Sequence, residues 1–399
     1  MKIFKRSIYF ILISVLFMNT VGMAVYSYTA PFLLNLGVKE SFIQLIVSIF
    51  PLSLFLYPPL LGKISDSIQN RRVFLRIGAL GMLILMLLFL FVRILIFIIL
   101  LLFLYGFFQS CLNLNFVLYQ ELTENDRTYI SYFNALIVLG WFFGAQIGGF
   151  YIDLLGIDSI FQFLLVVSAL NFIVILFLKE DREKIKERFM LMGRDVIETF
   201  EDENDTLFKN NVDISKSIYG ALFFRNFGIR PIMSVLAIIM AFNLASNTEI
   251  GFLIGINPLI QFFLMLLIGK LVSMGDDEDI RILKGLMVVG YFLSAFVIFG
   301  YLVSIDFSGY LFYQILVSIS YASFWTATHF YISQKTDHTN KGKYIGLANS
   351  SFYLGSFLGS LFFSILIGIY SEYYTPILFM IIFPALSAFL IIILFRKKK

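Results

Sequence analysis

Residues 49–63 read Ile-Phe-Pro-Leu-Ser-Leu-Phe-Leu-Tyr-Pro-Pro-Leu-Leu-Gly-Lys, and the stretch returns 207 residues later, at 256–270, as Ile-Asn-Pro-Leu-Ile-Gln-Phe-Phe-Leu-Met-Leu-Leu-Ile-Gly-Lys. Seven of the fifteen positions are identical, among them the Pro-Leu pair near the start and the Gly-Lys pair at the end. The same offset relates Asn19 to Asn226 upstream, and the register continues without a gap over about 45 positions. The chain is therefore predicted to contain two copies of one hydrophobic unit.

The composition is that of a membrane protein. Hydrophobic residues make up 59% of the chain and charged residues 14%, whereas a soluble domain carries about 25% charge. The mean hydropathy is +0.89. Apolar runs of spanning length recur throughout, and a helix satisfies its own backbone polar groups in lipid. The lone Cys111 excludes an intrachain disulfide. A duplicated membrane unit is typical of secondary transporters, whose binding site lies between the copies.

Twelve apolar stretches follow one another, six on each side of a polar stretch. We therefore expect an all-α integral membrane protein with a six-helix bundle at 1–178, a linker at 179–216 and a second six-helix bundle at 217–399. The linker opens basic and then turns acidic, and either a solvated segment or an interfacial helix explains it. The predicted spans lie near residues 8–35, 42–62, 73–92, 94–119, 129–152, 159–178, 217–241, 250–269, 284–304, 311–334, 345–370 and 374–395.

The positions of lysine and arginine predict the orientation. If both termini are cytoplasmic, Lys39 and Arg93 are the basic residues that fall in outer loops, as the excess of positive charge on the inner side requires. The basic start followed by an apolar run resembles a signal peptide, but the run is too long and is part of the repeat. We expect a multi-pass protein of the cell membrane. The net charge of +4 reflects this topology and does not indicate a nucleic-acid partner.

The segment after the second span reads Gly62-Lys-Ile-Ser-Asp66-Ser-Ile-Gln-Asn-Arg71-Arg72. It resembles the loop signature of the major facilitator superfamily, Gly-x-Leu-Ala/Ser-Asp-Arg-x-Gly-Arg-Arg, in spacing and in its place between spans two and three. Positions 67, 69 and 70 depart from the signature. The resemblance implies the fold of that family (MFS), with two six-helix bundles related by a pseudo-twofold axis and both termini cytoplasmic. It also implies that Gly62, Asp66, Arg71 and Arg72 form a cytoplasmic latch between the bundles.

Glycines at four-residue spacing mark spans five and eleven. Gly140, Gly144 and Gly148 form one strip on a helix, and Gly355 and Gly359 form another. Such a strip lets a neighbouring helix approach closely. The resemblance implies that the strips are sliding contacts between the two halves, while ordinary helix packing explains them equally well.

The resemblance also implies that spans one, four, seven and ten line the solute site. Polar and aromatic residues form stripes on these spans, and such stripes should face protein or water. Hydrogen bonding between helices explains them nearly as well. His329, beside the stripe of span ten, is an embedded residue that titrates near neutrality and is the candidate for proton coupling, although it could equally serve packing. The candidate solute-binding residues are Asn19, Tyr26, Gln109, Asn113, Asn226, Arg230, Tyr321 and Trp325.

Span seven contains the sharpest signal, because Arg225 and Arg230 both lie within it. An arginine at the centre of a span costs about 3 kcal/mol on the lenient insertion scale. Arg225 is close enough to the inner end to extend toward the cytoplasm, whereas Arg230 lies near mid-depth. The two residues are about 140° apart on an ideal helix. We therefore expect Arg230 in the cavity, leave Arg225 open, and expect Pro231 to kink the span.

The cores of the predicted spans contain no Asp or Glu, so the cavity is predicted to be net positive. This favours a small anionic or neutral polar solute, moved by alternating access without ATP, cofactor or metal. A multidrug or amphiphile efflux antiporter is the alternative, since 48 Phe and 21 Tyr could line its site. A non-transporting sensor or a membrane enzyme is a further alternative, although the clustered acids or histidines of an enzyme are absent. Partners are the solute, the bilayer and a coupling proton or sodium ion, if any, and we expect a monomer.

Overall fold

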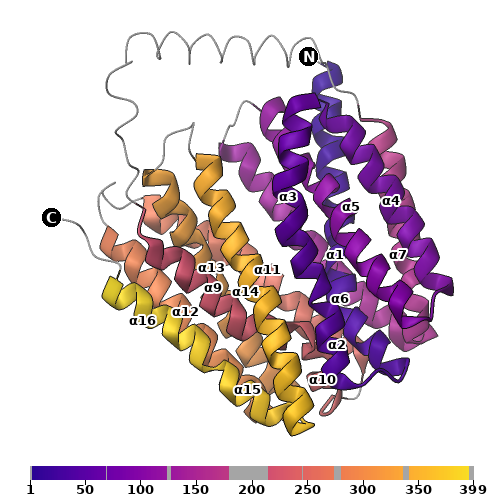
Figure 1. Ribbon diagram of the computed structural model, residues 1–399. Helices are drawn as coiled ribbons and strands as arrows, with labels where there is room; N and C mark the ends of the chain where they lie inside the picture. Colours follow the sequence, from indigo (N-terminus) through magenta and orange to yellow (C-terminus); the bar gives the residue numbers. More distant parts are fainter. Residues whose placement is uncertain are drawn as a thin grey trace.

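A computed structural model of the 399-residue chain describes residues 2–68, 70–123, 127–178, 214–244, 246–273, 280–335 and 341–394. Long helices joined by short turns account for these residues, as predicted (Figure 1). The elements before the predicted linker are α1 Lys2–Asn35, α2 Glu40–Val47, α3 Ile49–Ile68, α4 Arg71–Phe91, α5 Leu95–Leu122, α6 Arg127–Leu155, the 3-10 turn η1 Ile157–Ser159 and α7 Ile160–Leu176. The elements after it are α9 Lys216–Ser234, α10 Leu236–Ala241, α11 Asn247–Ser273, α12 Ile280–Val303, α13 Phe307–Lys335, α14 Lys341–Tyr370, α15 Tyr374–Met380 and α16 Ile382–Leu394. The predicted linker at 179–216 lies almost wholly outside the described residues.

Two of the predicted spans are interrupted three residues before a proline. The helix α2 ends at Val47 ahead of Pro51, and α15 ends at Met380 ahead of Pro384. A proline ring clashes with the carbonyl of the residue four positions earlier and cannot donate to it. Those residues are Val47 and Met380, the last residues of α2 and α15. The helix α11, in contrast, continues through Pro258, the repeat partner of Pro51.

Span seven is interrupted just beyond its proline. The helix α9 continues through Pro231 to Ser234, and the break comes at Val235, before α10. The Ser234 hydroxyl donates to the carbonyl of Pro231 at 2.7 Å, which competes with the helical ladder at this point. The helix is thus continuous through Pro231, and the kink expected there stays a prediction.

Within the described ranges, ten helical segments are long and apolar enough to cross a membrane. The two other predicted spans are also helical, as α9 with α10 and as α13. They are less apolar because α9 contains two arginines and α13 contains repeated Ser, Thr and Tyr. A polar helix of spanning length is stable when its polar face lies against other helices, and both of these carry predicted site residues.

The packing of the first half recurs in the second. Figure 1 shows the indigo-to-magenta helices on one side of the molecule and the red-to-yellow helices on the other. Corresponding helices make corresponding contacts, which is the arrangement expected of two related bundles. In the first half α1 packs on α6 and α7, α4 on α5 and α7, and α3 on α5; in the second α9 packs on α14 and α16, α12 on α13 and α16, and α11 on α13.

The glycine strips show the repeat at atomic detail. A Cβ atom on Gly140 or Gly144 would collide with the carbonyl oxygen of Leu16 or Thr20 in α1. In the second half a Cβ on Gly355 or Gly359 would collide with the carbonyls of residues 223 and 227 in α9, each 207 positions beyond its counterpart. The strip of α6 therefore packs on the backbone of α1, and the strip of α14 packs on the backbone of α9. Both contacts lie within one half, so the expectation of sliding contacts between the halves is wrong for these glycines.

The two halves meet along α6 with α11, and along α2 and α3 with α14. Gly251 and Gly255 of α11 lie against the backbone of α6 near Ala145. Hydrogen bonds then join the halves at the end of the molecule where α2, α10 and α15 lie, away from the N-terminus (Figure 1). Gln44 of α2 bonds Ser234 at 3.2 Å.

Asp153, in the last turn of α6, makes the most extensive of these contacts between the halves. Its carboxylate accepts from the main-chain nitrogens of Asn247 and Thr248 at 2.9 and 2.7 Å. It also accepts from the side chains of the same two residues at 2.8 and 2.6 Å. A carboxylate at the first turn of a helix satisfies free N–H groups and complements the helix dipole. The first half thus caps α11 of the second half and joins the two halves at this end.

Candidate solute-binding site

Both arginines of α9 point into protein, on different faces of the helix. Arg225 is 3% exposed, and its guanidinium makes two hydrogen bonds to side chains. Nε donates to Ser294 Oγ at 3.1 Å, and Nη1 donates to Asn226 Oδ1 at 3.0 Å. Its guanidinium carbon lies 4.5 Å from the centre of the Phe324 ring. Arg225 therefore ties α9 to α12 and α13 and is not placed to extend toward solvent.

A pair of buried serines, Ser294 and Ser320, continues the hydrogen bonds that begin at Arg225. Ser294 and Ser320 lie 2.7 Å apart through their hydroxyls, and both reach the carbonyl of Gly290. Each is fully buried. These two serines were not predictable from the sequence, because a single small polar residue in an apolar helix is too common to stand out.

Arg230 lies where the two halves meet and is partly buried. Its guanidinium carbon is 4.7 Å from the ring centre of Phe352 in α14 and 5.5 Å from that of Tyr26 in α1. The Tyr26 hydroxyl also donates to the main-chain oxygen of Arg230 at 3.4 Å. Contact with ring faces stabilises a cation by about 0.5–2 kcal/mol and supplies no negative charge. Among the described residues, no Asp or Glu contacts either guanidinium of α9.

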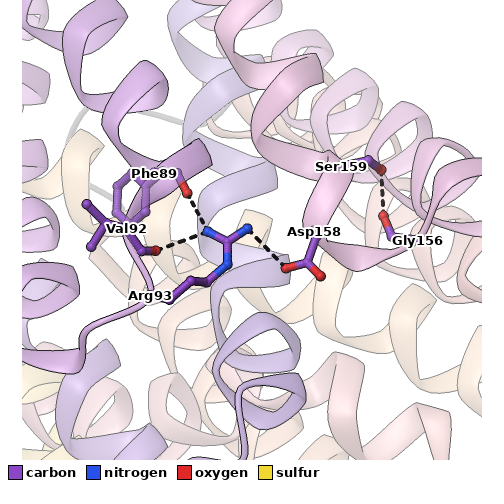
Figure 2. A network of polar contacts seen from close by, with 6 residues as sticks. All are labelled: Phe89, Val92, Arg93, Gly156, Asp158 and Ser159. Carbon is purple, nitrogen blue, oxygen red and sulfur yellow. Dashed lines mark hydrogen bonds and ion pairs between the residues drawn. The ribbon is translucent and has the colours of Figure 1, made fainter.

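Arg93, in the loop between α4 and α5, shows the contrast (Figure 2). Nη2 lies 3.4 Å from Asp158 Oδ1, and Nη1 donates to the carbonyls of Phe89 and Val92 at 3.0 Å each. Both charged side chains are exposed, so the pair contributes less than about 1 kcal/mol. An arginine at the surface is thus matched by a carboxylate, whereas those in the interior of α9 are matched by rings, an amide and a hydroxyl.

An aromatic wall from α13 lies next to Arg230. Tyr321 and Trp325 are one helical turn apart, and their rings lie 5.6 Å apart at an interplanar angle of 21°. The Trp325 ring also contacts Phe352 at 5.5 Å, and Phe352 is the ring beneath Arg230. His329 extends the wall, with its ring 4.5 Å from that of Trp325. Phe352 therefore brings Arg230 together with Tyr321 and Trp325, the predicted residues of span ten. Phe352 itself was not predictable as a site residue, because nothing in the sequence distinguishes it among 48 phenylalanines.

The repeat-related asparagines are occupied by helix contacts. Asn19 Nδ2 donates to the carbonyl of Val15 at 2.8 Å, and Asn226 Nδ2 donates to that of Leu222 at 2.7 Å. The amide oxygen of Asn19 accepts from Trp141 Nε1 at 3.0 Å, while that of Asn226 accepts from Arg225. Both amides thus hold neighbouring side chains in place within their own halves.

The two predicted residues of α5 differ in their surroundings. Gln109 is buried beside Gly22 of α1, and its Oε1 has no hydrogen-bond partner among the residues that the structure describes. Asn113 is exposed. The buried Asn115, which is not among the predicted site residues, donates to Ser14 Oγ at 3.0 Å and so joins α5 to α1. Gln109 is therefore the α5 side chain with an acceptor to offer at the centre of the first half.

The sequence profile of the Major Facilitator Superfamily matches residues 12–199 and 218–399. The chain belongs to this superfamily. The match covers both halves, as the duplicated sequence and the duplicated packing require. No curated protein sequence matches the chain.

Solved structures of MFS transporters share the fold at low sequence identity. The nucleoside transporter NupG superimposes with a TM-score of 0.73 at 16% identity, covering 100% of each chain. A D-xylose-proton symporter gives 0.75 at 14%, covering 97% of each chain. An auto-inhibited POT family peptide transporter gives 0.75 at 12%, covering 99% of this chain and 97% of that one. These MFS structures carry three different solutes, so the shared fold does not specify the solute of this transporter.

The MFS loop motif is described in part. Gly62 has no atom within 4 Å of the position of a Cβ, and Arg71 is buried and donates through Nη1 to Ser65 Oγ at 2.6 Å. The side chain of Asp66 lies outside the described residues, so the latch between Asp66 and the arginines stays a prediction. In the described part of the chain no group of three His, Cys, Asp or Glu side chains is placed to hold a metal.

Proposed function

We propose that this MFS transporter moves a small organic anion across the cell membrane by alternating access, with Arg230 as the anion-binding residue. A neutral polar solute is the alternative within the same class. Tyr26, Tyr321 and Trp325 surround the solute in this proposal, and Asn19 and Asn226 hold the site in shape. The two bundles at 1–178 and 217–399, the linker at 179–216, cytoplasmic termini and a monomeric state complete the proposal.

The observation that carries the proposal is the uncompensated charge of Arg230. A guanidinium in the interior of a membrane protein is costly unless it is paired, and ring faces compensate only part of that cost. A carboxylate or phosphate offers the planar acceptor that guanidinium binds with two parallel hydrogen bonds. Because Arg230 lies between Tyr26 of the first half and Phe352 of the second, a bound anion would contact both halves. Binding energy can then be coupled to the movement between them.

Flux in proteoliposomes tests the proposal. Purified protein is reconstituted and the uptake of labelled small carboxylates is measured with the wild type, Arg230→Gln and Arg230→Lys. We expect Arg230→Gln to lose uptake and Arg230→Lys to retain a reduced rate, because lysine keeps the charge without the planar pair of donors. Arg93→Gln is the matched control and should transport normally. Unchanged carboxylate uptake in Arg230→Gln would contradict the proposal.

The efflux alternative is distinguished in the same preparation. An amphiphile antiporter would export a lipophilic cation such as tetraphenylphosphonium, and Arg230→Gln would leave that export intact or improve it. A sensor without transport would show ligand binding with no flux. Neither alternative explains the uncompensated charge of Arg230. A cationic substrate would in addition be repelled by this arginine.

Coupling to a proton is proposed through His329, which lies against Trp325 of the same site. If a proton is the coupling ion, an inward proton gradient should accelerate uptake, and His329→Gln should abolish the acceleration while leaving exchange between internal and external solute. Acceleration by a sodium gradient would assign the other ion, and no effect of either gradient would indicate facilitated transport.

A further inference from the structure

The two tryptophans of the chain differ in how their indole N–H groups are used. Trp141 donates to Asn19 Oδ1 at 3.0 Å. Trp325 has no hydrogen-bond partner for Nε1 within the described part of the chain, and the same is true of Tyr321 Oη. Embedded Trp and Tyr normally find an acceptor for these groups. Their polar tips are therefore unmatched close to Arg230, which no described Asp or Glu contacts.

The wall lies beside both arginines of α9, because the guanidinium carbon of Arg225 is 5.5 Å from the centre of the Tyr321 ring. Tyr321 and Trp325 are partly exposed, while Phe324 between them is fully buried against Tyr291 and the guanidinium of Arg225. One face of α13 is thus used for packing and the adjacent face presents two nearly parallel rings. Phe352 contacts both the Trp325 ring and the guanidinium of Arg230. The two partly exposed rings therefore lie beside this guanidinium.

We propose that the solute is an aromatic carboxylate, with its anionic group on Arg230 and its planar ring against the Tyr321–Trp325 wall. The inference rests on the proposed function and makes it more specific. A planar ring matches the flat face of the wall through offset or edge contacts. The carboxylate supplies the missing counter-charge, and a ring substituent that accepts hydrogen bonds can engage Trp325 Nε1 or Tyr321 Oη.

The test uses pairs of carboxylates that differ in aromaticity. Binding to the purified full-length protein is measured by isothermal titration with benzoate, phenylacetate and indole-3-carboxylate, and with cyclohexanecarboxylate and cyclohexylacetate as saturated partners. Benzamide serves as the uncharged partner of benzoate. We expect each aromatic acid to bind at least tenfold more tightly than its saturated partner, and benzoate to bind at least tenfold more tightly than benzamide.

Variants of the two tryptophans locate the effect. Trp325→Leu should remove the preference for the aromatic ring, and Trp325→Phe, which keeps a ring and guards against a folding defect in the leucine variant, should retain most of it. Trp141→Phe should leave the preference unchanged. Equal affinities for aromatic and saturated acids, or a preference that survives Trp325→Leu, would overturn this inference while leaving the anion proposal intact. Equal affinities for benzoate and benzamide, or no binding of any carboxylate, would overturn both.

Discussion

The helices α1 and α9 occupy equivalent places in the two halves, yet they differ at their centres. The carbonyls that receive the glycine strips correspond at the 207-residue offset, and Asn19 corresponds to Asn226 with the same hydrogen bond to the preceding turn. At the positions of Arg225 and Arg230, however, the first half has Met18 and Met23. The duplication has thus preserved the packing while the charge is confined to one copy. Packing tolerates little change because interiors are close-packed, whereas a side chain at the solute site can diverge.

The largest effect is expected from giving the second half the residue of the first. Arg230→Met copies Met23 and should lower carboxylate uptake by at least 100-fold, because the counter-charge for the anion is lost. Thermal stability should stay the same or rise, since an uncompensated buried charge is removed. Uptake in proteoliposomes and a thermal unfolding scan measure both quantities. Met23→Leu is the control in the first half, and equal losses in the two variants would show that the halves share the role.

The shared packing is tested at its closest contact. Gly144→Ala places a Cβ against the carbonyl of Thr20 and should lower stability by about 1–3 kcal/mol, the usual cost of overpacking. Gly359→Ala should cost a similar amount, because its contact with α9 is equivalent. Gly285→Ala is the control, since nothing lies within 4 Å of its Cβ position. Chemical denaturation in detergent provides the comparison, and stability that changes in one half alone would break the equivalence of the packing.

The connection between the halves predicts a conformational effect. Asp153→Ala removes the acceptor of four hydrogen bonds at the start of α11 and should weaken the contact between the halves at this end by about 1–2 kcal/mol. Spin labels on cysteines replacing the exposed Leu155 and Phe242 should then report a larger share of long distances. Asp158→Ala is the matched control, because Asp158 is exposed at a nearby loop and pairs within the first half. An unchanged distance distribution in Asp153→Ala would mean that the cap does not hold this end.

The smallest effect is expected at the first-half asparagine. Trp141→Phe removes one hydrogen bond to Asn19 and should lower stability by about 1 kcal/mol. Uptake should change less than twofold, because Asn19 is engaged in packing. A loss of uptake comparable to that of Arg230→Met would instead place Asn19 in the solute site.

Most of the fold was predictable from the sequence, because it depends on regularities that the chain displays directly. Apolar runs of spanning length required helices, and the repeat of residues 49–63 required two related halves. The confinement of charge to span seven was equally visible. The exact place of the break after Pro231 was not, because it depends on the local bond from Ser234 to the Pro231 carbonyl.

The amino-acid sequence by itself determined that the chain is a duplicated membrane protein of the MFS type with two arginines in one span. Only the tertiary structure decided which arginine bonds a serine and an amide within the second half and which lies between the halves against Tyr26 and Phe352. It also decided that the glycine strips pack within a half and that Asp153 caps α11. The physical reason is that helical periodicity gives the angle between two side chains on one helix, while their partners come from helices distant in the chain. Ser294 and Phe352, the respective partners of Arg225 and Arg230, could be identified only once those helices were packed together.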